Sequence, residues 1–222
     1  MKLDVVKRRY VAFSNEDRGR YKCLLSPYIF IFLLLSSFFS LSLSAQGLSE
    51  QEIIQKMSAA AGAIRTVRCD FTQTRYTKML KGAQVSKGRM SCELPGKLRW
   101  EYTSPVGSAI IMEGSNVRIE EGGKVKEAKN SFVAEMARMI MNSVAGKCLT
   151  DSKAFQVSAQ EMPTEYVATL LPLRKDMRRM YSKLVLHFNL RQSTVTEVEL
   201  HERNGDRTII ELQDIHINEE DR

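Results

Sequence analysis

Apolar and polar side chains alternate along many short segments of this chain, and that alternation constrains the fold more than any other feature. A period of two residues turns one face of an extended strand toward a protein interior and the other toward solvent. Val67, Cys69 and Phe71 share one face of such a segment, with Arg68 and Asp70 between them. Further strands are predicted at 90–94, 98–102, 109–113, 116–121, 125–128, 154–159, 166–171, 184–189, 195–202 and 207–217.

The connections between neighbouring segments are short and carry turn residues. Pro95-Gly96 separates two of the predicted strands, and Asn204-Gly205, the strongest hairpin signal in the chain, separates the last two. Connections of this length cannot hold the crossovers that parallel strands need. The sequence therefore predicts a mainly β protein of the α+β kind, built on an antiparallel sheet or barrel.

Two segments have helical periodicity instead. Ser49 and Glu52 form a capping box ahead of the first segment. Its apolar stripe consists of Ile53, Ile54, Met57, Ala60, Ala61 and Ile64. The second helix is predicted between Asn130 and Gly146, where Gly146 would form the C-cap. Its stripe consists of Phe132, Met136, Met139, Ile140 and Val144. Both stripes must be covered, so we expect a strongly curved sheet whose concave face or opening is covered by the helices.

Residues 1–45 have the order of regions of a secretory signal peptide. A basic stretch is followed by apolar and small residues from 28 to 43, then by Ser44 and Ala45. The apolar run is shorter than the roughly 20 residues of a membrane span, so a permanent anchor is the less favoured alternative. We expect cleavage near Ala45 and a single soluble domain at 46–222 outside the cytoplasm.

The net charge of +7 is unevenly distributed along the chain. Seven basic and three acidic side chains lie in residues 1–45, so a charge of +4 belongs to the predicted signal peptide. The +3 on the remainder does not suggest the concentrated basic face that binds phosphate backbones. We therefore expect no nucleic-acid partner.

No catalytic or metal-binding spacing is present. The chain lacks the common hydrolase, nucleotide-binding and zinc-protease motifs. His187, His201 and His216 lie in separate predicted strands, and we expect surface or partly buried histidines there rather than metal ligands. A nucleophile pair of Cys69 with a distant histidine is disfavoured, because this thiol lies on the apolar face of its strand. The sequence predicts neither an enzyme nor a bound metal or cofactor.

Two further features leave alternatives open. Cys69, Cys92 and Cys148 remain after the predicted cleavage, and no C-x-x-C pair occurs. We expect buried free thiols; the alternative is one disulfide, between Cys69 and Cys92. The basic cluster at 174–179 is interpreted as a solvated hairpin loop; the alternative is contact with anionic headgroups or a membrane-bound partner.

Four short motifs, in order, resemble the periplasmic lipoprotein carrier family, the LolA proteins. They are Asp-Phe-Thr-Gln at 70–73, Ser-Lys-Gly-Arg-Met at 86–90, Leu-Pro-Gly-Lys-Leu-Arg-Trp-Glu-Tyr at 94–102 with Pro105, and Glu-Gly-Ser-Asn-Val at 113–117. The resemblance extends over about residues 51–212. One departure stands out: the family's Arg-Pro is Leu94-Pro95 here. In the family that arginine is thought to latch the lid by hydrogen bonds, which Leu94 cannot donate.

The resemblance implies an incomplete antiparallel β-barrel lidded by helices around an apolar cavity. Such a protein carries the acyl chains of lipoproteins from the inner to the outer membrane. The implied partners are the acylated cargo, an inner-membrane lipoprotein-release transporter and an outer-membrane acceptor, and the carrier is a monomer in the periplasm. The closest alternative is a carrier or sensor of free phospholipid or another acyl lipid. An adaptor with a filled core and a secreted enzyme are the other classes considered.

The ligand-binding residues expected from this resemblance follow the apolar strand faces and the second helical stripe. The cavity wall would consist of Val67, Phe71, Met90, Leu94, Leu98 and Trp100. The lid would consist of Phe132, Met136, Met139 and Ile140. Leu98 and Trp100 match family positions that point into the cavity. In a β protein without a ligand, all of these side chains would simply form the core.

Overall fold

The computed structural model describes residues 47–79, 82–105, 107–128 and 132–219. The predicted signal peptide at 1–45 lies outside the described residues, and so does the side chain of Phe132. Among the described helices, none combines the length and apolar character needed to cross a membrane.

One antiparallel sheet of eleven strands forms the body of the described chain. The strands are β1 (Thr66–Tyr76), β2 (Ala83–Glu93), β3 (Lys97–Ser104), β4 (Ser108–Glu113), β5 (Asn116–Glu121), β6 (Lys124–Glu127), β7 (Phe155–Glu161), β8 (Glu165–Pro172), β9 (Tyr181–Asn189), β10 (Thr194–Glu202) and β11 (Arg207–Ile217). Their spatial order is β6-β5-β4-β3-β2-β1-β11-β10-β9-β8-β7. The predicted mainly β, antiparallel architecture is confirmed.

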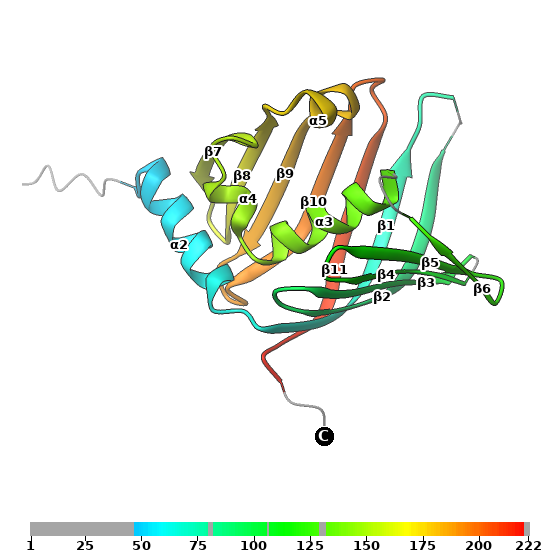
Figure 1. The fold of residues 1–222 in the computed structure, drawn as a ribbon. Coiled ribbons are helices and arrows are strands. Elements are labelled where there is room, and N and C mark those ends of the chain that lie inside the picture. The colour runs from blue at the N-terminus through cyan, green and yellow to red at the C-terminus, as the bar shows by residue number, and fades with distance from the viewer. Residues whose placement is uncertain (1–46, 80–81, 106, 129–131, 220–222) are drawn as a thin grey trace, which may run out of the picture. The chain divides into compact units, whose positions relative to one another are not determined.

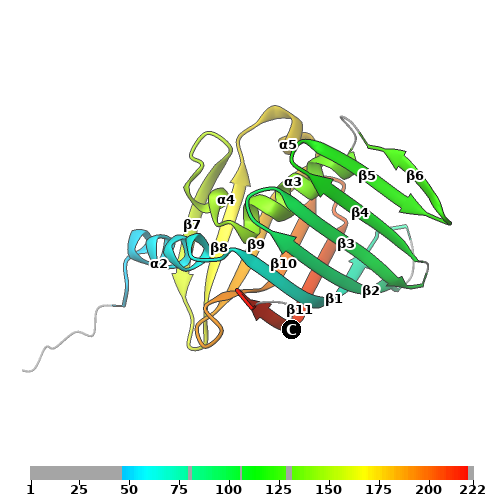
Figure 2. The ribbon, with the colours of Figure 1, turned by 60° about the horizontal axis from the view of Figure 1, so that its bottom comes forward.

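The sheet consists of two meanders joined by a single long-range pairing. Strands β1 to β6 pair in sequence order, as do β7 to β11, and β1 pairs with β11 from Val67 opposite Ile217 to Tyr76 opposite Arg207. The sheet is strongly curved (Figure 1), and a second view shows the same curvature (Figure 2). Because β6 and β7 are its two edges, the barrel stays incomplete, as expected.

Four helices accompany the sheet in the described part of the chain: α2 (Glu50–Gly62), α3 (Phe132–Val144), α4 (Lys147–Thr150) and α5 (Lys175–Met180). The capping box of α2 is present, since Ser49 Oγ accepts from the Glu52 N–H at 3.3 Å and the Glu52 carboxylate accepts from the Ser49 N–H at 2.8 Å. In the apolar stripe of α2, the side chains of Ile53, Met57 and Ala61 are buried.

Helix α3 lies on the inside of the curved sheet (Figure 1). Ala134, Ala137 and Met141 are buried in the common core with side chains of the sheet. Gly146 follows α3 with a φ of 67°, the left-handed conformation expected of a helix C-cap. A Cβ at Gly146 would lie 2.6 Å from the Cβ of Ala61, so glycine also lets this turn approach α2 closely.

The basic cluster at 174–179, predicted as a solvated hairpin loop, connects the antiparallel strands β8 and β9, and its basic side chains are exposed. The prediction missed a short helix in this connection, α5, in which Met177 packs into the core. The three thiols are free and buried, as expected, and no disulfide joins Cys69 to Cys92. His187 and His201 are half-buried strand residues and His216 is exposed, in line with the burial expected of them.

Gly88 lies where the sheet is packed too closely for a larger residue. A Cβ there would lie 2.0 Å from the Glu101 carbonyl oxygen and 2.4 Å from Phe71 Cζ. We expect Gly88→Ala to lower the free energy of unfolding by about 1–3 kcal/mol, because the sheet must shift to admit the methyl group. Gly62→Ala in α2 is the control, since its Cβ meets nothing within 4 Å. Equal urea midpoints for the two variants would contradict this account.

Candidate functional site

An apolar cavity lies between α3 and the concave face of the sheet. Its free volume is about 60 Å³, which is room for only a few water molecules. The helices contribute Met57, Ala61, Met136, Met139, Ile140, Ser143, Val144 and Leu149 to its wall, and Ile64 adds to it from the turn after α2. The cavity is therefore narrow, because mostly apolar side chains fill the space around it.

Strands of the second meander form much of the wall opposite α3. Alternate residues of these strands point inward, which places Leu184 and Phe188 of β9 on the cavity. The other contributors are Thr194, Val195, Val198, Leu200, Ile210, Leu212 and Ile215. Val195 and Val198 are three residues apart and still both face inward, because the β9–β10 register shifts between Val195 and Glu197.

The first meander contributes an aromatic group. The rings of Phe71 and Trp100 stack with centroids 3.9 Å apart, and Tyr102 meets Phe71 edge-on at 5.5 Å. The Tyr102 hydroxyl donates to Gln73 Oε1 at 3.1 Å, and burial raises the pKa of Tyr102. The Trp100 N–H is buried without a hydrogen-bond acceptor in the described part of the chain.

Helix α3 covers the cavity through small and flexible side chains. Ala134 and Ala137 let the helix approach the sheet, and Met136 and Met139 line the cavity beneath it. On the same helix, Met141 Sδ lies 3.3 Å from Cys92 Sγ of β2. Thioether chains have three rotatable bonds and repack around different neighbours, so this contact layer can change shape.

The structure brings together most of the residues expected at the site. Val67, Met90, Trp100, Met136, Met139 and Ile140 line the cavity. Phe71 and Leu98 are buried in the adjoining core but are not among the lining residues, and Phe71 lies behind Trp100. The cavity side chains of β9 to β11 were not named from the sequence, although the alternation in those strands carried the signal.

Leu94 lies apart from this cavity. It is half-buried in the turn after β2 and lines a separate recess with Ile64, Pro95 and Met141. Its backbone N–H donates to the Arg65 carbonyl at 2.8 Å. The apolar side chain therefore sits near the end of α3.

The thiols have no sign of catalytic activation. Burial raises the pKa of Cys69 and of Cys92 to about 12, and that of Cys148 to about 11. A nucleophilic cysteine needs the opposite shift, because the thiolate is the reactive form. The chemistry that the cavity offers is burial of apolar groups.

Comparison with known proteins gives one consistent family. The family model described as outer membrane lipoprotein carrier protein LolA matches residues 62–221. An outer-membrane lipoprotein carrier protein of Methylococcus capsulatus is 34% identical over 62 residues, 28% of this chain and 30% of the relative. One of Coxiella burnetii is 24% identical over 190 residues, 85% of this chain and 88% of the relative.

The chain was also compared with solved structures. The crystal structure of a LolA superfamily protein from Nitrosomonas europaea superposes with a TM-score of 0.44 at 10% identity, covering 79% of this chain and 96% of that one. The family assignment rests on the sequence match, which extends over well more than half of the chain. The chain therefore belongs to the LolA family of outer membrane lipoprotein carrier proteins.

Proposed function

We propose that this protein is a periplasmic carrier that shields the acyl chains of lipoproteins in the cavity beneath α3 during their transfer from the inner to the outer membrane. The observation that carries the proposal is the apolar cavity under an amphipathic helix, in a chain of the LolA family. The signal peptide expected at 1–45, cleaved near Ala45, would export the domain at 46–222 to the periplasm.

Acyl chains need such a carrier because water excludes them. Each methylene group gains roughly 0.8 kcal/mol on leaving water, so a lipoprotein with several chains would not cross an aqueous compartment alone. A wall of leucine, isoleucine, valine and methionine side chains offers that transfer without directional bonds. Cargoes with different protein parts could then share one site, since only their lipid would be buried.

The small free volume implies that cargo moves the lid. About 60 Å³ cannot accept a long acyl chain, so α3 has to give up part of its own packing when cargo enters. The side chains lost from the core would include Met141 with its contact to Cys92. That loss lowers the net affinity, which lets the cargo leave for an acceptor.

The route requires two membrane partners, an inner-membrane lipoprotein-release transporter and an outer-membrane acceptor, with the carrier acting as a monomer. A second recess between α3, α4 and α5 lies beside the lid and has mixed charge, since Arg138, Lys147 and Arg174 line it together with Glu135 and Asp151. The exposed Lys175, Arg178 and Arg179 of α5 suit contact with anionic headgroups or with a membrane-bound partner. The carrier itself needs no nucleotide, metal or catalytic group for this cycle.

A second candidate is a carrier or sensor of free phospholipid or another acyl lipid. Leu94 favours it, because an apolar side chain stands where the family's arginine would donate a hydrogen bond.

Cargo can be identified by native mass spectrometry of the protein purified gently from the periplasm of its host. We expect a triacylated lipoprotein; free phospholipid would favour the second candidate, and a protein that is ligand-free and takes up no fatty acid would refute both.

Val198 tests the cavity as the binding site. It is half-buried on β10 and lines the cavity, so Val198→Phe should fill the free space and weaken acyl uptake at least about tenfold. Uptake of palmitate can be followed by the emission of Trp100, the chain's one tryptophan, which lines the same cavity.

Val125→Phe is the control for this substitution, because Val125 is exposed on the edge strand β6. It should bind palmitate like the unchanged protein. Both variants are checked for folding by thermal unfolding. A folded Val198→Phe variant with undiminished uptake would place the acyl site elsewhere.

A further inference from the structure

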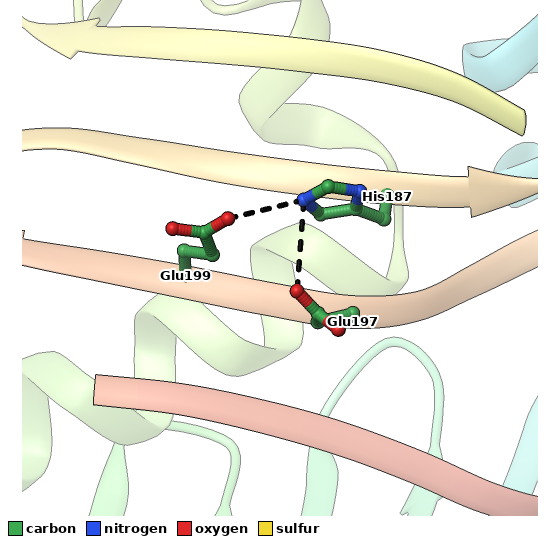
Figure 3. A group of neighbouring side chains, drawn as sticks. All are labelled: His187, Glu197 and Glu199. Carbon is green, nitrogen blue, oxygen red and sulfur yellow. Dashed lines mark hydrogen bonds and ion pairs between the residues drawn. The ribbon is translucent and has the colours of Figure 1, made fainter. Parts of the chain in front are cut away.

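The outer face of the sheet carries a cluster of histidine and glutamate side chains. His187 of β9 lies with its Nε2 3.3 Å from Glu199 Oε1 and 3.7 Å from Glu197 Oε1, both of β10 (Figure 3). These three ligand atoms all lie within 4.8 Å of one another. The neighbouring residues Leu186, Phe188 and Val198 point to the other face, so the cluster lies opposite the acyl cavity.

Local strand geometry positions the cluster. The register shift between Val195 and Glu197 turns Val195 into the cavity while it leaves Glu197 and Glu199 together on the outer face. His187 stands directly opposite Glu197 in the β9–β10 pairing. Bulges of this kind re-aim side chains and are found beside functional sites.

The outer contacts of His187 and Glu199 resemble the supporting contacts of a metal centre. His187 Nδ1 lies 3.2 Å from Glu165 Oε2 of β8, on the ring edge away from Nε2. Metal-bound histidines usually have such a carboxylate on the second nitrogen, which fixes the ring and leaves the first nitrogen free to coordinate. The other oxygen of Glu199 is held by His201 Nε2 at 2.7 Å.

The cluster lacks a permanent positive charge. Within the described part of the chain, the ion pairs of Glu197 and Glu199 run to histidines and to neither lysine nor arginine. Both ring nitrogens of His187 lie within hydrogen-bond distance of a carboxylate, so a protonated ring can donate to Glu165 and to Glu199. In the neutral ring that donates from Nδ1 to Glu165, the Nε2 lone pair faces two carboxylates, and a cation between the three atoms would relieve that repulsion.

We propose that His187, Glu197 and Glu199 form a binding site for a divalent transition metal of the zinc type on the outer face of the sheet. Zinc bonds to histidine nitrogen and carboxylate oxygen are about 2.0–2.2 Å long, so two ligands of a tetrahedral ion lie about 3.4 Å apart. The 3.3 and 3.7 Å separations from Nε2 match this spacing. An imidazole ligand disfavours magnesium and calcium, which prefer oxygen alone.

The three side chains supply fewer ligands than zinc accepts. Each is only partly exposed, with 20–31% of its side-chain surface accessible, so water or a donor from a partner can reach the remaining position. Structural zinc sites have four protein ligands, whereas sites with an open position exchange or share their metal. The site is thus suited to reversible binding or to metal-bridged contact with a partner.

Zinc titration of the full chain tests this proposal. The protein carries no histidine tag and has Cys23→Ser, so that this thiol cannot bind the metal. After removal of metals with a chelator, calorimetric titration with ZnCl₂ should show one saturable equivalent per chain. His187→Asn and Glu199→Gln should each weaken binding at least about tenfold, since loss of even a supporting contact costs 10–100-fold.

His216→Asn is the matched control. His216 likewise contacts a carboxylate, that of Glu219 at 2.9 Å, but it lies on an exposed part of β11 away from the cluster. Its loss should leave zinc binding unchanged. Because the cluster and the cavity lie on opposite faces, zinc should not change palmitate uptake, and His187→Asn should take up palmitate like the parent chain. Failure of the zinc proposal would therefore leave the carrier proposal intact.

A measurement without substitutions covers the case in which a variant does not fold. Cobalt(II) added to the unsubstituted chain should give visible ligand-field absorption at one equivalent, and zinc should displace it. The proposal would be overturned if the unsubstituted chain showed no saturable zinc binding. It would also be overturned if folded His187→Asn bound zinc as tightly as the parent chain, or if only His216→Asn lost binding.

Discussion

The concave face of an incomplete barrel is apolar along its length and cannot stay in water, and the rest of the structure follows from that constraint. Strands β1 and β11 join two meanders whose outer edges, β6 and β7, never meet. Closure by strand pairing is therefore not available, and α3 covers the inside of the curve instead. The small side chains of Ala134 and Ala137 let the helix approach, and the methionines fill the space that remains.

A cover made of a helix can be removed more easily than one made of paired strands. Its contact with the sheet consists of apolar packing, which cargo can replace with equivalent packing. Leu94 fits this picture, because it adds apolar surface near the end of α3 and no hydrogen bond from its side chain. In the proposed carrier cycle, uptake and release would depend on a small difference between two large burial energies. His187 and its carboxylates lie on the outer face, opposite the cavity.

The strands could be predicted from the period-two alternation and the start of α2 from the capping box, because local sequence patterns determine both features. The cavity was only partly predictable: Trp100 and Met90 were found by phase, whereas Leu98 shares that phase and lies in core that the cavity does not reach. Helix α5 was not predicted, because it has one buried residue, Met177, and so shows no apolar stripe in the sequence. The His187 cluster could not be predicted, since it depends on the pairing register and on a bulge that brings Glu197 opposite it.

Exposure of Cys92 tests most directly whether α3 is a lid that acyl cargo lifts. In a chain with Cys23, Cys69 and Cys148 replaced by alanine, the Cys92 thiol is covered by Met141, and burial raises its pKa to about 12. A thiol reagent at pH 8 should label it slowly in the free protein and much faster at saturating palmitate, with butyrate as the control. Labelling that stays slow while palmitate is bound would contradict a lid displaced by cargo.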